Sequence, residues 1–577
     1  MARLIFAIAA AILGALLAVA AVLAIPLQAQ AQTPPPRLEV VLTPQAGGAD
    51  AHMGVSMRME RPGLKVGDGL IRMPLRLVGI PLPDWSNAGL EARDDAGPIP
   101  LSASEEPPTP QGVYRRWSAG RATQGDVVIT YRAPPRRVTS TTNNGPLFDL
   151  REEAGGFAGA GNGFLVAPVA PGPWRIQLSW DLSKAPPGSR GVWSLGEGTV
   201  ETVGPSQLLQ FSYYYAGPLK SYPAQADPSF SFYWLSDPPF DPNELGDKMR
   251  ALYGSMAKFF DDEGGSYRVF VRQNPFKGTG GTGLARSFMF GYNFDAKPTV
   301  DSLQGLLAHE MAHTWPAMEG DHGDTAWYSE GMAEYYSTVL SHRAGAITTE
   351  RLLATYNERA AAYYSNPYVA YTNPEAAKIF WTDPVAQTVP YGRGWMYLLQ
   401  TEAAIRKASG GRRSLDDIVK AMHKRQRADQ PYGIPAWLEL VGAEIGVDAA
   451  KAGYDAMVAG RLLVPPADLY APCLKVERHD VRPFQLGFAR ASLNDDRVVR
   501  DLVPGSAAEK AGVRNGDVIV EASDINEVRK DEALPLTLKL KRADGSEATV
   551  AYAPRGAPVE GWRWTRDPAV PDSACRF

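Results

Sequence analysis

The stretch GLLAHEMAHTWPAMEG, residues 305–320, places two histidines four positions apart, with a glutamate directly after the first. We expect a helix here, with a capping box that starts at Asp301 and a stop at Pro316. Residues at i and i+4 share one helical face, so His309 and His313 could bind one metal ion together. The alternative is an amphipathic helix whose two histidines belong to the core.

A third ligand for such a site has to come from elsewhere in the chain, because catalytic zinc takes three protein ligands and keeps a fourth position open. The pattern that would supply another histidine shortly after His313 has Glu319 in that position. Glu330 is the better candidate, since it leaves room for a loop and a return helix. Glu334, one turn further, could orient a histidine by accepting its other N–H. Glu310 could take a proton from water without binding the metal.

The N-terminus has the pattern of a targeting segment. An apolar run follows Arg3 and reaches Ile25, and Ala29-Gln30-Ala31 then offers small residues typical of a cleavage site. We expect residues 1–31 to be a secretory signal of bacterial character, with an uncleaved membrane anchor as the alternative, since such a run can span a bilayer. In either case the protein is exported: periplasmic, secreted or anchored to the inner membrane.

Composition narrows the class of protein further. The chain has 577 residues, 45% of them hydrophobic and 21% charged, as expected for about three globular domains. A net charge of −4, without a Lys/Arg-rich run, gives no reason to expect nucleic acid as a partner. The two cysteines, Cys473 and Cys575, could form a disulfide in an oxidising compartment, although two free buried thiols are the alternative. Neither lies near the histidines, which disfavours a thiolate zinc site.

The pattern of apolar residues changes twice along the chain. Short alternating segments broken by Gly and Pro predict an antiparallel β domain first, with a flexible Gly/Ala/Pro-rich loop at 154–173. Helical spacing at 243–263, a strand at 266–272 and mostly helices thereafter predict an α+β domain. Strands and turns return after a Pro-rich joint. The predicted domains are 38–235, 236–468 and 478–556, followed by a tail at 557–577.

Two further segments carry a family resemblance. Together with the two histidines, SEGMAEY at 329–335 resembles the gluzincins, the thermolysin-like peptidases with a glutamate ligand on a second helix. YGRG at 391–394 resembles a Y-x-K-G motif, and the helical segment after it is similar to that of the M61 glycyl aminopeptidase family. Proteins of that family also have an N-terminal β domain and a C-terminal PDZ domain. The resemblance is strong at 301–426 and weak in the β domain.

This resemblance implies an exported, zinc-dependent metallopeptidase with a thermolysin-like catalytic domain, one Zn²⁺ per chain, and a peptide or protein substrate. His309, His313 and Glu330 would bind the zinc, and Glu310 would act as general base and later as acid. Tyr391 would donate its hydroxyl to the oxyanion. Hydrolysis through zinc-activated water needs a hydrogen-bond donor in addition to the metal, because negative charge develops on the substrate oxygen.

The sequence departs from the family at the residue that captures the substrate's free amine. In Gly280–Ser287 the family's glutamate position is occupied by Ala285. An α-ammonium in a dry cleft needs a carboxylate partner, so aminopeptidase specificity loses its basis. Arg286 would favour an acidic group, and Gly281 and Gly283 could belong to an edge strand that pairs with a peptide. Aminopeptidase action is what the resemblance implies. The alternatives are an endopeptidase or another exopeptidase mode, a hydrolase of non-peptide amides, and a non-catalytic peptide-binding scaffold.

The C-terminal hundred residues resemble a PDZ domain. Leu486, Gly487 and Phe488 would form its carboxylate-binding loop, and LVPGSAAEKAGVRNGDVIVEA at 502–522 matches the family core. The segment 525–532 leaves only a short helix, so the peptide groove would be shallow or absent. We therefore expect a structural or regulatory role for this domain in preference to peptide binding.

Overall fold

The structure is a computed structural model of the 577-residue chain and describes residues 34–577 with short gaps. The segment 1–31, predicted to be a signal or anchor, lies outside the described residues. Within the described part, no helix is long and apolar enough to cross a membrane. The gaps are 78–79, 83–88, 110–111, 141, 143–146, 171, 226, 263, 277–279, 294–297, 381–382, 384, 494–495, 573–574 and 576.

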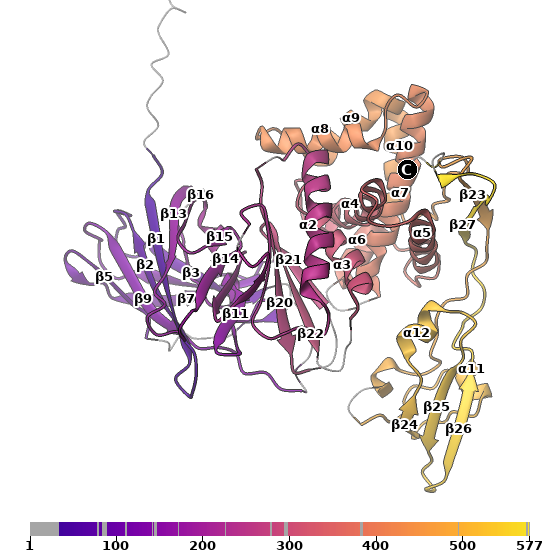
Figure 1. Cartoon of the computed structure of the whole chain (residues 1–577), viewed down its shortest axis with the longest axis horizontal. Coiled ribbons are helices and arrows are strands. Elements are labelled where there is room, and N and C mark those ends of the chain that lie inside the picture. Colours follow the sequence, from indigo (N-terminus) through magenta and orange to yellow (C-terminus); the bar gives the residue numbers. More distant parts are fainter. Residues whose placement is uncertain are drawn as a thin grey trace, which may run out of the picture.

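The N-terminal part of the chain forms three sheets (Figure 1). In β1 buried and half-buried residues alternate, so Leu38, Val40 and Leu42 face the core and their neighbours face outward. The pairing is antiparallel except that β1 runs parallel to β13. The seven-stranded sheet has the order β16 (Val200–Pro205), β13 (Pro173–Trp180), β1 (Arg37–Gln45), β2 (His52–Met59), β9 (Val127–Ala133), β5 (Glu91–Asp94) and β6 (Gly97–Pro98).

Two five-stranded sheets complete this part. One has the order β12 (Ala167–Pro168), β3 (Gly69–Leu77), β8 (Gly112–Ala119) and β7 (Leu101–Glu105), with β4 (Ile80–Pro81) paired to β3. The other has the order β10 (Arg151–Glu153), β11 (Gly156–Ala160), β17 (Tyr213–Gly217), β14 (Arg190–Trp193) and β15 (Gly196–Glu197). Two short 3₁₀ helices, Gly161–Gly163 and Ser206–Leu209, lie between strands.

The prediction of a flexible loop at 154–173 is wrong, because this segment contains the buried strand β11. Its glycines allow close approach of backbones. A Cβ at Gly159 would lie 2.6 Å from the Leu150 Cα, and one at Gly161 would lie 1.9 Å from the Leu209 carbonyl oxygen. A high glycine content therefore reflects tight packing here, where the sequence suggested mobility.

A mixed sheet begins the central part of the chain. Its order is β18 (Lys220–Tyr222), β19 (Phe230–Trp234), β20 (Tyr267–Asn274), β22 (Ser287–Asn293) and β21 (Gly280–Leu284), which makes β21 an edge strand. The second domain is predicted to begin at 236, yet β18 and β19 precede that residue and pair into this sheet. The hydrogen bonding of the sheet therefore starts before the predicted boundary.

Helices pack against this sheet and against one another (Figure 1). α2 shows how the sequence sets a helix, since Asp241 caps its start by accepting from the Asn243 backbone N–H at 2.8 Å. Its residues Leu245, Met249 and Met256 face the core. The helices are α2 (Pro242–Phe259), α3 (Val300–Ala312), α4 (His322–Arg343), α5 (Thr349–Tyr364), α6 (Asn373–Ile379), α7 (Val389–Ser409), α8 (Leu415–Arg427), α9 (Ile434–Ile445) and α10 (Val447–Val458), with a 3₁₀ turn at Ala386–Thr388.

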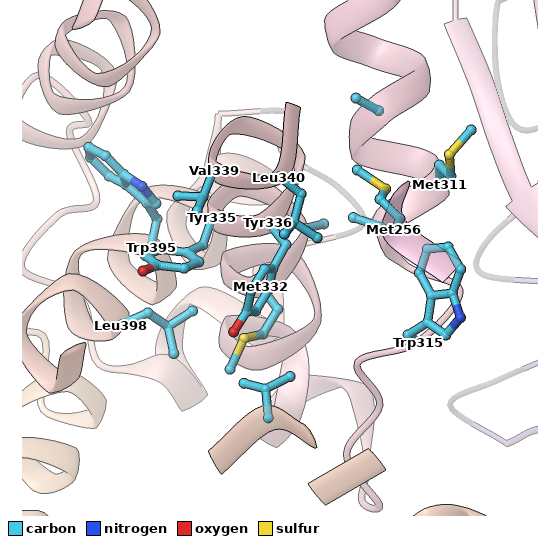
Figure 2. Packing of buried hydrophobic residues seen from close by; sticks show 14 of the residues in the cluster. Met256, Met311, Trp315, Met332, Tyr335, Tyr336, Val339, Leu340, Trp395 and Leu398 are labelled. Atoms are coloured by element: carbon cyan, nitrogen blue, oxygen red, sulfur yellow. The ribbon is translucent and has the colours of Figure 1, made fainter. Parts of the chain in front are cut away.

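The core that fixes the central helices is rich in methionine and aromatic side chains. Figure 2 shows Met256 from α2 and Met311 from α3 close together, with Tyr335 and Tyr336 of α4 lying between them and Trp395 of α7. Side chains from α2, α3, α4 and α7 thus belong to one buried cluster. The helices that carry the sequence motifs are held together by this cluster.

The capping box expected at Asp301 is wrong by two residues. Thr299 is the N-cap of α3, and its hydroxyl accepts from the Ser302 backbone N–H at 3.2 Å while the Ser302 hydroxyl reaches back to the Thr299 N–H. Asp301 lies in the first turn, where its charge suits the helix dipole. The helix ends at Ala312, before Pro316.

The C-terminal part of the chain is a small domain inserted in a two-stranded ribbon. β23 (Leu474–Arg478) pairs with β27 (Trp562–Arg566), which lies in the segment predicted as a tail. The predicted disulfide between Cys473 and Cys575 is present at the base of this ribbon. Between the two strands lies a three-stranded sheet at one end of the molecule (Figure 1), composed of β24 (Val518–Ala522), β25 (Leu536–Lys541) and β26 (Glu547–Tyr552), with α11 (Ala507–Lys510), α12 (Ile525–Lys530) and a 3₁₀ turn at Arg490–Leu493.

Candidate metal centre

Three side chains from α3 and α4 converge on one point. The His309 Nε2 lies 3.2 Å from the His313 Nε2 and 3.3 Å from the Glu330 Oε2, and the His313 Nε2 lies 3.5 Å from the same oxygen. A tetrahedral zinc with bonds of 2.0–2.2 Å separates its ligand atoms by roughly 3.3–3.6 Å. The three atoms therefore have the spacing that one such ion requires.

Two further observations fit a cation between these atoms. The Glu330 Oε2 is buried and, among the described residues, meets no hydrogen-bond donor in good geometry. A buried oxygen of this kind normally has a partner, and an ion would supply one. The donor set of two imidazoles and one carboxylate is also one that zinc uses in catalytic sites.

Helix geometry places these ligands. His309 lies on the last turn of α3 and is 9% exposed, and His313 is the C-cap residue of that helix. Glu330 follows one turn after the buried Trp327 on α4. Leu307 of α3 and Met332 of α4 belong to the same buried cluster. The ligands are thus carried by rigid elements, as precise metal geometry requires.

Each imidazole has a polar side chain near its other nitrogen. The His309 Nδ1 lies 3.0 Å from the Oε1 of Glu334, the carboxylate that the sequence predicts to orient it, at an angle outside that of a regular hydrogen bond. The His313 Nδ1 lies 3.4 Å from the Ser329 hydroxyl, a partner that the sequence reading missed. α4 therefore supplies one ligand and both orienting groups. The partners favour the tautomer that leaves each Nε2 free for a metal.

The charges of the site favour a cation. Burial alone lowers the pKa of His309, but the carboxylates of Glu330 and Glu334 outweigh it and raise that pKa to about 10. Burial raises the pKa of Glu330, while the two imidazoles close to its carboxylate outweigh this effect and hold the pKa well below its usual value. A positive charge is therefore stabilised where the three ligand atoms meet.

Glu310 lies on the side of this centre that faces the edge strand β21. A Cβ placed on Gly283 would be 3.1 Å from the Glu310 Oε2, so the missing side chain leaves room for this carboxylate. Burial raises the pKa of Glu310, and the two imidazoles oppose that shift without cancelling it. A carboxylate with a raised pKa next to a metal centre is suited to take and return a proton.

Tyr391 comes from the first turn of α7. Its ring stacks on His309 with centroids 5.7 Å apart and an angle of 8° between the planes. Burial and the carboxylates of Glu330 and Glu310 raise the pKa of Tyr391, so its hydroxyl stays protonated at neutral pH. The hydroxyl is therefore available as a hydrogen-bond donor beside the ligand cluster.

A cavity of about 850 Å³ opens beside the ligand cluster. It is lined by α3 and α4 on one side and by α5 on another, and Glu310, Glu334 and Tyr391 reach it. From α5, Arg351 and Arg359 line it as well. The volume is ample for a short peptide segment or a drug-sized molecule.

Three groups of predicted residues fall outside the ligand cluster. Arg286 donates to the Asp262 carboxylate at 2.5 Å and to the Ser266 carbonyl at 2.9 Å, so its guanidinium is held by these groups and does not line the cavity. At Gly281 the Cβ direction is filled by the Phe288 ring, 1.8 Å away. Leu486, Gly487 and Phe488 lie in the small C-terminal domain, where Phe488 is buried in the core.

Comparison with known proteins adds evidence on the fold. The chain superimposes on an aminopeptidase N family protein from Idiomarina loihiensis with a TM-score of 0.64 and 14% identity, over 92% of this chain and 98% of that one. Native LTA4 hydrolase from yeast gives a TM-score of 0.46 at 13% identity, over 75% and 68% of the two chains. The yeast enzyme in complex with bestatin gives 0.46 at 14% over the same shares.

The likeness to the Idiomarina protein spans nearly the whole of both chains, so this chain has the fold of an aminopeptidase N family protein. No family model matches the sequence. No curated protein matches it either.

Proposed function

We propose that the protein is a zinc-dependent metallopeptidase of M61-like build, with a thermolysin-like catalytic domain and a PDZ-like C-terminal domain. The observation that carries the proposal is the spacing of 3.2–3.5 Å among the His309, His313 and Glu330 ligand atoms. These residues would hold one zinc ion. The fold of an aminopeptidase N family protein supports the same reading.

A zinc ion bound there would lower the pKa of a water molecule to about 7 and polarise the carbonyl of the scissile bond. Glu310 takes the proton of the attacking water and delivers it to the leaving amine. The Tyr391 hydroxyl donates a hydrogen bond to the substrate oxygen on which negative charge develops. Glu334 and Ser329 keep the two imidazoles in the required tautomer.

The substrate is a peptide or protein, and we propose that its reactive bond is internal or follows a blocked N-terminus. Ala285 stands where the related aminopeptidases have the carboxylate that captures a free amine. Four carboxylates line the cavity in the described part of the chain. Glu310 and Glu334 already have other roles, Asp301 pairs with Lys248, and Glu358 pairs with Arg351. A free ammonium would therefore lie in the cleft without a partner, which costs several kcal/mol.

Export completes the proposal. The N-terminal segment is consistent with a cleaved bacterial signal, so the enzyme would act in the periplasm or outside the cell, or at the inner membrane if the segment stays attached. The disulfide between Cys473 and Cys575 supports an oxidising compartment. The PDZ-like domain would have a structural or regulatory role.

The experiment uses the purified chain from residue 32 onward with pairs of peptides of identical sequence, one with a free and one with an acetylated N-terminus. Cuts are mapped by mass spectrometry with and without a zinc chelator. We expect chelator-sensitive internal cuts in both members of each pair. Removal of single residues from the free member alone would show an aminopeptidase, and the role given to Ala285 would then be wrong.

A chain that holds zinc and cuts no peptide would contradict the peptidase proposal. Hydrolysis of small non-peptide amides by that chain would then favour an amidase on the same site. Peptide binding without hydrolysis would favour a scaffold that has kept the fold.

A further inference from the structure

Arg359 on α5 contacts Glu334, the residue proposed to orient His309, at both its side chain and its backbone. Its Nε forms an ion pair with the Glu334 carboxylate, and its Nη1 donates to the Glu334 backbone carbonyl at 2.5 Å. The same nitrogen donates to the Thr338 hydroxyl, and Nη2 lies 3.4 Å from the Ser337 hydroxyl. One guanidinium thus binds both the side chain and the main chain of Glu334.

These contacts connect Arg359, through Glu334, to the proposed metal ligand His309. Arg359 binds one oxygen of Glu334, and the other oxygen, Oε1, lies 3.0 Å from the His309 Nδ1. The Arg359 and Glu334 side chains are 16% and 17% exposed, so the pair is largely shielded from water. The order of contacts is therefore arginine, carboxylate, imidazole and metal position.

Removal of Arg359 would leave the Glu334 carboxylate without its ion-pair partner. A carboxylate at this depth is stable only when paired, and a half-broken pair leaves a costly buried charge. Without Arg359, Glu334 would turn toward water in the cavity and release the His309 ring. An arginine suits this task because its planar fork reaches two acceptors in a fixed geometry.

A direct role in substrate binding fits Arg359 less well, although it lines the cavity. All three of its nitrogens already have acceptors on α4. Arg351, two turns earlier on α5, lines the same cavity but pairs with Glu358 at 3.3 Å and, within the described part of the chain, forms no ion pair with Glu334. The two arginines share a helix and a cavity and differ in their partner.

We propose that Arg359 is a positioning residue for the metal centre, which through Glu334 holds the His309 imidazole with its Nε2 toward the ion. The inference rests on the metal centre of the proposed function. It adds α5, a third helix, to the two that supply the ligands. No sequence motif marks this arginine, since its role depends on the packing of α5 against α4.

The test measures zinc affinity of the metal-free chain by competition with a chromophoric chelator, and the visible spectrum of the cobalt form. We expect Arg359→Ala to bind zinc about 10–100-fold more weakly and to change the cobalt spectrum. The zinc affinity of Arg359→Lys should lie between that of Arg359→Ala and that of the unaltered chain. Lysine keeps the positive charge but lacks the planar guanidinium that reaches two acceptors. Arg351→Ala is the matched control and should bind zinc as the unaltered chain does.

A double-mutant cycle separates positioning from a general structural effect. If Arg359 acts through Glu334, then Arg359→Ala should cause no further loss of zinc affinity in a Glu334→Ala chain. Thermal unfolding of the metal-free variants shows whether each is folded. Should Arg359→Ala not fold, the comparison of Arg359→Lys with the unaltered chain decides the question.

The inference is overturned if Arg359→Ala, or in its place Arg359→Lys, binds zinc within twofold of the unaltered chain. It is equally overturned if Arg351→Ala loses as much affinity, or if the loss persists in the Glu334→Ala background. An unaltered chain that binds no zinc would be a different result, because it removes the proposed function and this inference with it.

Discussion

Glu310 faces Gly283 on the edge strand, while its neighbours on α3 turn their imidazoles toward Glu330. The helix α3 and its C-cap therefore carry two of the proposed metal ligands and the proposed proton acceptor on adjacent faces. The glycine is part of this arrangement, since any Cβ at 283 would press on the carboxylate. The division of roles leads to a prediction at the scale of the single residue.

Glu310→Gln should lower kcat by about 10²–10⁴-fold, because the amide cannot accept the proton of the attacking water. Zinc content should stay the same, since Glu310 is not among the three ligand atoms. Peptide cleavage rates and metal analysis of the same samples test this. A variant that retains most of its activity, or one that loses its zinc, would contradict the role given to Glu310.

The sequence predicted that His309, His313 and Glu330 lie together, because the spacing of such residues on two helices is a local pattern. Ser329 was not singled out as a partner, since a serine before a glutamate carries no signal of its own. Arg359 could not be found either, because α5 comes close to Glu334 only through tertiary packing. Arg286 was given a role in the cleft, yet Asp262 and Ser266 hold it elsewhere.

At the scale of elements, α4 and α7 cross at two glycines. A Cβ at Gly394 would lie 1.9 Å from the Trp327 carbonyl oxygen, and one at Gly331 would lie 2.6 Å from the Gly394 carbonyl carbon. These contacts are with backbone, so no side chain can move aside. Gly331 adjoins Glu330, and Gly394 lies three residues after Tyr391. The close crossing thus sets the distance between Glu330, a proposed metal ligand, and Tyr391, the proposed oxyanion donor.

Gly394→Ala should destabilise the protein by about 1–3 kcal/mol, because the added methyl forces the two helices apart. It should also reduce kcat by moving Tyr391. Gly254→Ala on α2 is the control, since a Cβ there meets nothing within 4 Å and alanine favours a helix. Thermal unfolding and peptide cleavage measure both effects. Equal unfolding temperatures for the two variants would show that the crossing tolerates a side chain.

Elements were predictable where their pattern is local and periodic. The alternation at 174–180 predicts what the structure shows as β13, and the helical spacing at 243–263 predicts α2. The strand β11 could not be predicted, because its glycines and alanines neither alternate between apolar and polar residues nor include a β-branched side chain. The cap of α3 was misplaced, since Thr299 and Asp301 are both good caps and only the path of the preceding chain selects between them.

At the scale of the whole molecule, a buried charge cluster joins the N-terminal sheets to the mixed sheet that contains β20. The Asp149 carboxylate accepts from the Arg272 Nη2 at 3.0 Å and from the Arg151 Nε at 2.8 Å, and Arg136 faces it at 3.5 Å. Arg272 is fully buried on β20. Burial raises the pKa of Asp149, but the arginines outweigh it and hold the pKa at about 2.

Because this folded-state pKa lies below the unfolded value of about 3.9, Asp149 stabilises the protein fully above pH 4. Its contribution, about 2–3 kcal/mol, is lost as the pH falls from 4 to 2. We expect Asp149→Asn to lower the unfolding temperature at pH 6 and the gap to the unaltered chain to narrow below pH 4. A gap that stays constant with pH would show that the ion pairs do not contribute.

The small C-terminal domain is attached through the ribbon of β23 and β27, and that ribbon packs on α5. The Asn357 side chain of α5 donates to the Trp564 carbonyl at 2.9 Å and accepts from its N–H at 2.8 Å, and Trp564 packs against Trp395. One face of α5 thus meets the ribbon, while the other lines the cavity with Arg359. The ribbon should support the site, and the inserted domain should not be needed for it.

This division can be tested by excision. Val481 and Val559 exchange backbone hydrogen bonds of 2.9 and 2.8 Å, so a two-residue Asn-Gly turn can replace 482–558. The shortened chain should keep its zinc and cleave small peptides at rates within a few-fold of the full chain. A second variant that ends before β27 removes the ribbon strand and should lose stability. Loss of zinc on excision of the domain alone would contradict this account.

The central claim is that His309, His313 and Glu330 form a metal centre, and the most direct measurement is zinc content after equilibration and removal of free metal. The account predicts one zinc per unaltered chain and essentially none for Glu330→Ala. Glu319→Ala is the control, because Glu319 occupies the position of a third ligand in a related motif but lies outside the ligand cluster; it should keep one zinc. Equal zinc in the Glu330 and Glu319 variants, or no zinc in the unaltered chain, would contradict the claim.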